Sequence, residues 1–175
     1  MLSSPKFSLR SAAVAAVAAV ALVATIASGE EDTAEKVDGE TGTQQTADFA
    51  VGDTVKLGDW QVKVHGVQDP YISQNEFITP DAGNRYVVVD TEVTNKSDSS
   101  QVVSSVMCFE LRDETNRSYD VTITDNVDTS LDGDVSADTS RRGSLSYEVP
   151  ETSKELQLQF KCDLFGSGSA LINLS

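Results

Sequence analysis

The sequence has few basic residues, one histidine and two cysteines, and each shortage excludes a class of function. Lysine and arginine number 13 against 28 acidic residues, so the formal net charge over 175 residues is −15 and the pI is about 4.2. Nucleic-acid binders need a basic surface to displace counterions from phosphate, so we expect no nucleic-acid partner. One histidine and two cysteines leave too few side chains for most metal sites and nucleophile–base pairs.

The length of the chain suits one ordinary domain with accessory segments, and residues 1–29 predict a targeting segment. Lys6 and Arg10 are the only charges before Glu30, and the stretch between is dominated by Ala and Val. A basic start, an apolar stretch and small residues at its end are the parts of a secretory signal peptide. An uncleaved membrane anchor is the alternative. Either reading predicts a protein that is exported, secreted or held at the cell surface of a bacterium.

The next segment, residues 30–48, is acidic and almost free of large apolar side chains. It holds seven acidic residues and one lysine, and Val37 is its only large apolar residue. Such a composition cannot bury enough surface to offset the entropy lost on ordering, so we expect a disordered linker.

Residues 49–175 alternate between apolar and polar side chains, which is typical of half-buried β-strands. The longest run, Tyr86–Thr94, predicts a central strand, and Gly66 interrupts an earlier run, which predicts a β-bulge. The other alternating sets are Val55 and Leu57; Trp60, Val62 and Val64; Met107, Phe109 and Leu111; Tyr119, Val121 and Ile123; Leu145, Tyr147 and Val149; Leu156, Leu158 and Phe160; and Ala170, Ile172 and Leu174.

This pattern predicts an all-β fold, because no window has the three-to-four spacing of an amphipathic helix. Each strand offers one apolar face that has to meet another sheet. A two-sheet antiparallel sandwich is therefore our expectation, with a small barrel as the alternative architecture.

Four stretches of the sequence resemble a known family: VGDTVKLGDWQVKVHGV, NRYVVVDTEVTNKSDSS, CFELRDETNRSY and LSYEVPETSKELQLQF. Together they resemble the bacterial family called domain of unknown function 4352, from about Phe49 to Leu174. The resemblance implies an immunoglobulin-like sandwich on an exported protein, distantly similar to a mycobacterial secreted immunoprotective antigen. It transfers no catalytic residue. One departure is Arg141-Arg142-Gly143, where the family often has a Pro-Gly turn before the Tyr-Glu-Val-Pro strand.

Two cysteines in an exported protein suggest a disulfide between Cys108 and Cys162. The strand pattern raises a difficulty, because Cys108 faces away from Phe109 and Leu111 whereas Cys162 continues an inward series that includes Phe160. A bridge across the core would need a bulge or a bend near Cys162. The sequence therefore leaves open both a disulfide and two unpaired thiols.

His65 is the single histidine and lies on the polar face of a predicted strand, beside Lys63. A lone histidine on such a face is typically solvated. A hydrolase built on His65 would need a serine hydroxyl or a carboxylate within about 3 Å. The chain has no Gly-x-Ser-x-Gly elbow, so we predict no enzyme and no catalytic residue, and keep the hydrolase as a lesser alternative.

Several acidic residues lie close together in the sequence, at Asp125, Asp128, Asp132, Asp134 and Asp138. Calcium prefers clustered hard oxygens, and loops at one end of a sandwich can converge carboxylates. The spacing does not reproduce the Asp-x-Asp-x-Asp-Gly loop, and Asp132-Gly133 is typical of a hairpin turn. A calcium-responsive or small-ligand sensor is therefore an alternative function, and we predict no metal site or cofactor.

The long connection between Asp69 and Asn84 contains four apolar residues that the strand pattern does not place in the core: Tyr71, Ile72, Phe77 and Ile78. Exposed loop aromatics are good anchors for a partner, although packing over the end of the sandwich is the alternative. The sequence thus predicts a non-catalytic, monomeric, exported domain that binds a protein or cell-envelope component through this loop. It would meet the membrane only through an uncleaved N-terminal segment.

Overall fold

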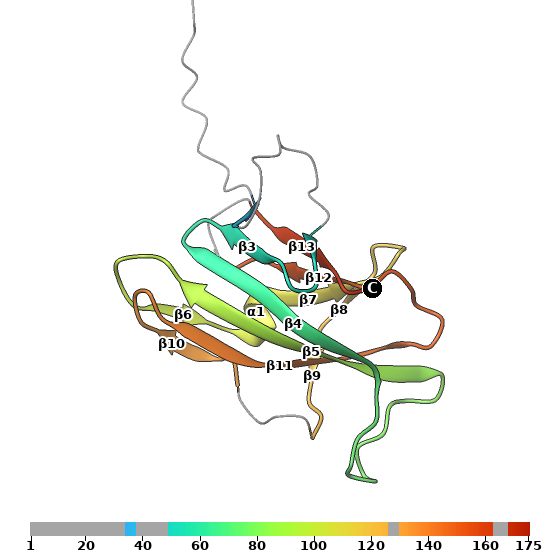
Figure 1. Ribbon diagram of the computed structural model, residues 1–175. Coiled ribbons are helices and arrows are strands. Elements are labelled where there is room, and N and C mark those ends of the chain that lie inside the picture. The colour runs from blue at the N-terminus through green and yellow to red at the C-terminus, as the bar shows by residue number, and fades with distance from the viewer. Residues whose placement is uncertain (1–33, 38–48, 126–129, 163–167) are drawn as a thin grey trace, which may run out of the picture.

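The computed structural model describes residues 34–37, 49–125, 130–162 and 168–175. The targeting segment expected at residues 1–29 lies outside them. Within these ranges the helical structure is limited to α1, a single turn from Ser105 to Cys108, and no helix is long and apolar enough to cross a membrane. The remaining regular structure is β-strand (Figure 1).

The larger sheet of the described chain has six strands in the order β1–β3–β4–β5–β11–β9, paired antiparallel throughout. Its strands are β1 (Glu35–Lys36), β3 (Thr54–Leu57), β4 (Trp60–Tyr71), β5 (Asn84–Asn95), β9 (Val121–Thr122) and β11 (Ser140–Pro150). The run that the sequence marks as a central strand is β5, and it does lie in the interior of this sheet, between β4 and β11.

The smaller sheet has five strands in the order β2–β13–β12–β7–β8, and its one parallel pair within the described residues is β13 with β2. Its strands are β2 (Phe49–Ala50), β7 (Phe109–Arg112), β8 (Ser118–Tyr119), β12 (Gln157–Phe160) and β13 (Ala170–Asn173). A separate antiparallel pair joins β6 (Gln101–Val103) to β10 (Gly133–Val135).

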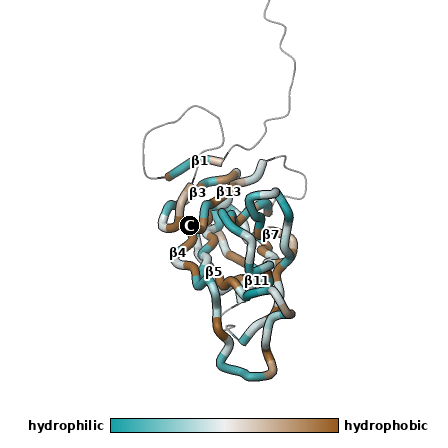
Figure 2. The backbone as a smooth tube through the Cα atoms, turned by 90° about the vertical axis from the view of Figure 1, so that its right-hand side faces the viewer, coloured by the Kyte–Doolittle hydropathy of each residue, from teal (hydrophilic) through white to brown (hydrophobic). Residues whose placement is uncertain are grey.

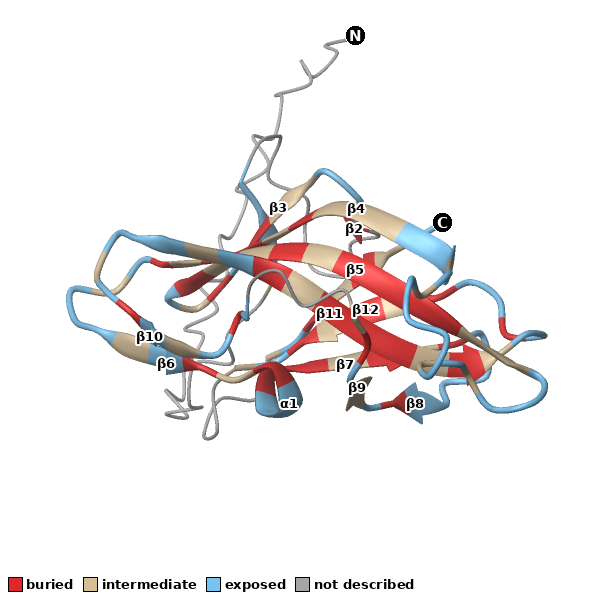
Figure 3. Ribbon diagram, turned by 90° about the horizontal axis from the view of Figure 1, so that it is seen from below, coloured by how far each residue is buried: buried red, intermediate tan, exposed pale blue. Residues whose placement is uncertain are grey.

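The core lies between the two sheets, where their inward residues meet (Figure 3). The fully buried side chains include Val62, Val87, Val89, Leu145 and Tyr147 from the larger sheet and Leu111, Leu158, Phe160 and Ile172 from the smaller one. These are the positions that period-two alternation places on inner faces. Burying each such side chain contributes about 1.5–3 kcal/mol, which drives the two sheets together. The predicted antiparallel sandwich is confirmed.

A register shift in the pairing of β4 with β5 lies between Val64 and Gly66, so the predicted β-bulge is confirmed. Val64 is fully buried, and Val67 beyond the bulge again packs against the core. An extra residue in one strand restores the inward phase after the break. The bulge leaves His65 on the outer face of the sheet.

Two of the alternating sets predicted from sequence are wrong at one member each. Met107 lies in α1 rather than in a strand and is 62% exposed. Ile123 is 83% exposed, because the segment predicted as one strand divides: β8 pairs in the smaller sheet and β9 in the larger one. A chain that changes sheets at Asp120 no longer presents alternate residues to one core.

A short part of the predicted disordered linker pairs with the larger sheet. In β1, Glu35 lies opposite Lys56 and Lys36 opposite Val55 on β3. The Nζ atom of Lys36 lies 2.6 Å from Oδ1 of Asp53. Main-chain hydrogen bonds and this ion pair can hold a strand that buries little apolar surface, which composition alone does not reveal.

Candidate functional site

The β4–β5 loop, residues 72–83, projects beyond the body of the sandwich (Figures 1 and 2). Of the four residues predicted to bind a partner here, Ile72 and Phe77 are exposed, at 71% and 86%. Tyr71 and Ile78 are half-buried instead. The four predicted residues are therefore divided: Ile72 and Phe77 face solvent, whereas Tyr71, which ends β4 rather than lying in the loop, and Ile78 are less exposed.

The carboxylate of Asp125, from the segment after β9, holds the start of this loop. Its Oδ1 accepts a 2.9 Å hydrogen bond from the Tyr71 hydroxyl, and its Oδ2 accepts bonds from the backbone N atoms of Gln74 and Asn75 at 2.8 and 3.1 Å. Burial acts to raise the pKa of Asp125, but hydrogen bonds from Ser73, Tyr71 and the Gln74 amide outweigh it and lower the pKa. The anchoring group is therefore a carboxylate at neutral pH.

The second half of the loop folds back onto the outer face of the larger sheet. The hydroxyl of Tyr86 on β5 donates to the carbonyl of Thr79 at 2.9 Å. On β11, Oε1 of Glu148 accepts from the Asp81 backbone N at 2.8 Å and from Nδ2 of Asn84 at 2.9 Å. Because these contacts come from two interior strands, the loop is fixed to the rigid part of the fold.

The segment that carries Asp125 lies on the same outer face. Oγ1 of Thr124 and Oγ of Ser146 are 2.8 Å apart, and Val88, opposite Ser146 in the register, is only 2% exposed. The neighbouring Ile123 is 83% exposed. The sequence does not reveal Ile123 as a surface residue, because the period-two alternation places it on the same face as the buried Tyr119. Only the change of sheet between these residues turns Ile123 outward.

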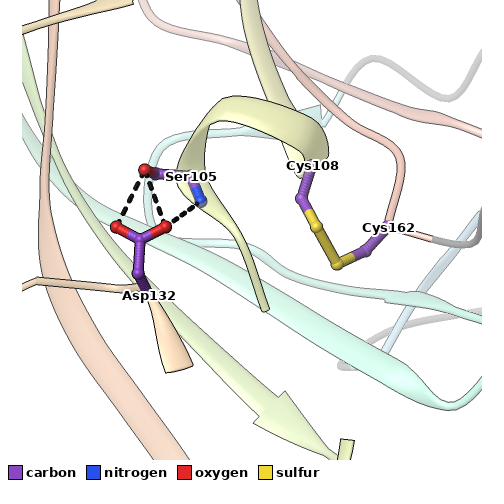
Figure 4. The surroundings of a disulfide bond; sticks show 4 residues. All are labelled: Ser105, Cys108, Asp132 and Cys162. Carbon is purple, nitrogen blue, oxygen red and sulfur yellow. Dashed lines mark hydrogen bonds between the residues drawn. A yellow bond between two sulfur atoms is a disulfide. The ribbon is translucent and has the colours of Figure 1, made fainter. Parts of the chain in front are cut away.

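Three of the five acidic residues considered for calcium, Asp125, Asp132 and Asp138, serve separate local contacts. Asp125 holds the β4–β5 loop, and Asp138 forms an ion pair with Lys96 at 3.1 Å. Asp132 accepts hydrogen bonds from the backbone N and the Oγ of Ser105, at 2.7 and 2.9 Å (Figure 4). Asp128 lies outside the described residues. Among the described residues, no three His, Cys, Asp or Glu side chains gather in a way that could hold a metal ion.

Cys108 and Cys162 are joined by a disulfide (Figure 4). Both residues lie outside the paired strands, since Cys108 ends α1 and Cys162 follows the last residue of β12 by two positions. The phase difficulty raised by the sequence therefore does not arise, because the helical turn removes Cys108 from the alternation of β7. The backbone N of Lys161 donates to the Cys108 carbonyl at 2.8 Å, which brings the two chains together.

His65 lies beside a carboxylate on the outer face of the larger sheet. Its Nε2 is 3.0 Å from Oε2 of Glu92 on β5. A carboxylate in this position could orient the ring of a catalytic base. Over the described ranges, however, no hydroxyl or thiol is hydrogen bonded to His65. Glu92 could thus orient His65 in a hydrolase, but the described residues place no nucleophile in hydrogen-bond contact with His65.

Comparison with solved structures gives proteins of the same fold. The yjhA protein from Bacillus subtilis is similar with a TM-score of 0.58 and 18% identity, over 73% of this chain and 99% of that chain. The ycdA protein of Bacillus subtilis strain 168, a candidate lipoprotein, is similar with a TM-score of 0.50 and 18% identity, over 77% of this chain and 39% of that one.

A mycobacterial secreted protein is also similar. It is MPT63 from Mycobacterium tuberculosis, with a TM-score of 0.47 and 13% identity, over 82% of this chain and 99% of that chain. The search of curated proteins found no match. The model of the family described as domain of unknown function 4352 matches residues 49–170, which include both sheets of the sandwich except β1 and all but the first residue of β13, and the chain therefore belongs to that family.

Proposed function

We propose that this chain is an exported, non-catalytic immunoglobulin-like domain that binds a protein or a cell-envelope component through its β4–β5 loop. One observation carries the proposal: Phe77 is 86% exposed and Ile72 is 71% exposed on a loop that the fold itself holds in place. Large apolar side chains at the centre of a contact supply most of the free energy of binding in protein interfaces.

The anchoring of the loop strengthens this reading. Fixing the backbone of one residue costs about 1–2 kcal/mol in conformational entropy, and a loop that orders only on binding has to meet that cost at the moment of contact. Here Asp125, Tyr86 and Glu148 have already fixed the backbone on both sides of Phe77. A partner would therefore meet a loop that is already in its binding conformation.

Export is supported by three observations. The chain begins with a basic, then apolar segment that is typical of a signal peptide, and it contains a disulfide, which persists in oxidising compartments. A protein of similar fold, ycdA, is a candidate lipoprotein. The test is to express the full chain in a bacterial host, fractionate the cells and determine the N-terminus by mass spectrometry. An intact N-terminus on cytoplasmic protein would contradict export.

Photo-crosslinking tests the binding surface. Phe77 is replaced by the photoreactive residue p-benzoylphenylalanine in the full chain, and Met107, which is 62% exposed on α1, is replaced in a matched control. We expect ultraviolet light to link position 77 to the partner, a protein or a cell-envelope component, in a discrete adduct. The adduct should be absent from position 107 and should be lost when Ile72→Ser is added. Equal adducts at both positions, or none at position 77, would contradict the proposal.

The same chains need a folding control. Because Phe77 is largely solvated, Phe77→Ser is expected to change the free energy of unfolding by no more than about 0.5 kcal/mol. A loss of several degrees in the melting temperature would instead show that Phe77 stabilises the fold.

A further inference from the structure

Ile123 is a third exposed apolar residue close to the β4–β5 loop. It precedes Asp125 by two residues, and Asp125 accepts hydrogen bonds from the backbone N atoms of Gln74 and Asn75 in that loop. Two residues of extended chain span at most about 7 Å, so the backbone of Ile123 lies within that distance of the residue that holds the loop. We call Ile72, Phe77 and Ile123 the apolar tip; each is more than 70% exposed.

The charge around the apolar tip has a single sign. Loop residues 72–83 contain Glu76 and Asp81 but no lysine or arginine, and residues 120–125 contain Asp120 and Asp125 but again no lysine or arginine.

Along the chain, the basic residue nearest to Ile123 is Arg117, whose guanidinium lies over the ring of Tyr119. The one nearest to the β4–β5 loop is Arg85, which is already paired. Its Nη2 lies 3.0 Å from Oδ2 of Asp69 and 3.1 Å from the carbonyl of Ser153, and its Nη1 donates to the carbonyl of Pro150 at 2.6 Å. The hydrogen bond that Arg85 donates to Asp69 raises the pKa of Arg85, so this guanidinium stays charged and engaged. The apolar tip is therefore flanked along the chain by carboxylates that Arg85, engaged elsewhere, does not neutralise.

We propose that the partner of this site is a protein surface with an apolar pocket edged by lysine or arginine, and that all three residues of the apolar tip enter it. This inference rests on the function proposed above and names the partner of the same site. An anionic membrane offers apolar depth, but its surface charge repels carboxylates as strongly as it attracts basic segments. A basic rim supplies the complementary charge that speeds association and excludes wrong partners.

The two parts of the surface make different contributions to binding. Desolvation of the apolar tip in a pocket should set the dissociation rate, because buried hydrophobic anchors dominate truncation effects. Glu76 and Asp81 lie at the rim, where exposed charges mainly change the association rate and its dependence on salt. Truncating the tip and reversing the rim charges should therefore have separable effects.

The probe is a random short-peptide library displayed on phage and selected against the full chain. We expect the enriched peptides to combine aromatic or aliphatic residues with lysine or arginine. Their affinity should fall about tenfold with Phe77→Ser or with Ile123→Ser, which corresponds to about 1.4 kcal/mol.

Glu76→Lys together with Asp81→Lys should weaken peptide binding several-fold. Raising the salt from about 0.1 M to about 1 M shortens the Debye length from about 10 Å to about 3 Å and should weaken peptide binding further. Val106→Ser, at an exposed position on α1, is the matched control and should have no effect.

A second arm tests the membrane directly with vesicles of phosphatidylcholine, alone or with phosphatidylglycerol. We expect the full chain to sediment with neither. Vesicle binding that Phe77→Ser abolishes would overturn the protein partner while leaving the loop as the binding site. Peptides that are acidic or uncharged and insensitive to salt, but still depend on Phe77, would overturn the basic rim alone. Peptide binding that neither Phe77→Ser nor Ile123→Ser weakens would overturn both this inference and the proposed function.

Discussion

The hydroxyl of Tyr119 donates a 2.7 Å hydrogen bond to Oδ2 of Asp113, across the turn that joins β7 to β8. Oδ1 of the same carboxylate accepts from the backbone N and the Oγ1 of Thr115, at 2.8 and 2.7 Å, and from the backbone N of Arg117 at 3.1 Å. In the described part of the chain, Asp113 is the one charged residue that is buried, at 8% exposure. The Tyr119 and Thr115 hydrogen bonds outweigh burial and hold the pKa of Asp113 well below its usual range.

Acid should therefore weaken the fold through Asp113. A carboxyl whose pKa is lower in the folded state contributes stability above its unfolded pKa of about 3.9, and that contribution is lost as the pH falls further toward the folded pKa. Asp113→Asn should be less stable than the natural chain at pH 7, and the difference should narrow below about pH 4. Urea unfolding at both pH values measures it. If the free energy of unfolding differed between the two chains by the same amount at both pH values, the ionisation of Asp113 would not be involved.

Two buried tyrosines should respond oppositely to loss of their hydroxyls. Tyr147 is fully buried, burial raises its pKa, and its hydroxyl has no hydrogen-bond partner among the described residues. Tyr147→Phe should raise the free energy of unfolding by about 1 kcal/mol, since it removes an unpaired polar group from the core. Tyr119→Phe, which removes a donor from Asp113, should lower it by about 2 kcal/mol. Destabilisation by Tyr147→Phe in thermal unfolding would show that its hydroxyl is paired.

Replacing both cysteines with serine should destabilise the domain. The disulfide closes a sequence separation of 54 residues, and its loss should lower the free energy of unfolding by about 4 kcal/mol on the chain-entropy model. Denaturant unfolding of the double variant beside the oxidised and reduced natural chain measures this. Mass spectrometry after alkylation without reductant is the control, and two labelled thiols in exported protein would contradict the bridge.

Asn95 should be the least replaceable polar residue near the end of β5. It is fully buried, its Nδ2 donates to the carbonyls of Ser99 and Val135 at 2.7 and 2.9 Å, and its Oδ1 accepts from the backbone N and Oγ of Ser97. Asn95→Ala should lower the free energy of unfolding by about 3 kcal/mol, since several buried groups lose their partner. Asn173→Ala, at a half-buried position, is the control and should cost less than about 1 kcal/mol.

Local periodicity predicted most of the core because a strand with one buried face repeats every two residues. Val87, Val89 and Leu158 are buried as that pattern requires. It failed at Met107 and Ile123 because a helical turn and a change of sheet both break the phase without an obvious breaker such as glycine or proline. The same turn explains why the pattern could not decide the pairing of Cys108.

The β4–β5 loop shows the second limit of sequence reasoning. Composition indicated that Ile72 and Phe77 belong to a connection, and both are exposed. It could not show that Asp125, some 50 residues away in the sequence, holds the backbone of that loop, or that Ile123 lies beside it. Such contacts depend on how the strands are ordered in space, which alternation along one segment does not contain.

The chain from Ser118 to Thr122 belongs to both sheets, since β8 pairs with β7 and β9 pairs with β11. Neither sheet can separate from the core without pulling on this segment, so partial opening of one sheet disturbs the hydrogen bonds of the other. The sandwich should therefore come apart as one cooperative unit, with no state in which a single sheet survives. Such a domain withstands proteases until it unfolds completely, a property that would suit the exported role proposed above.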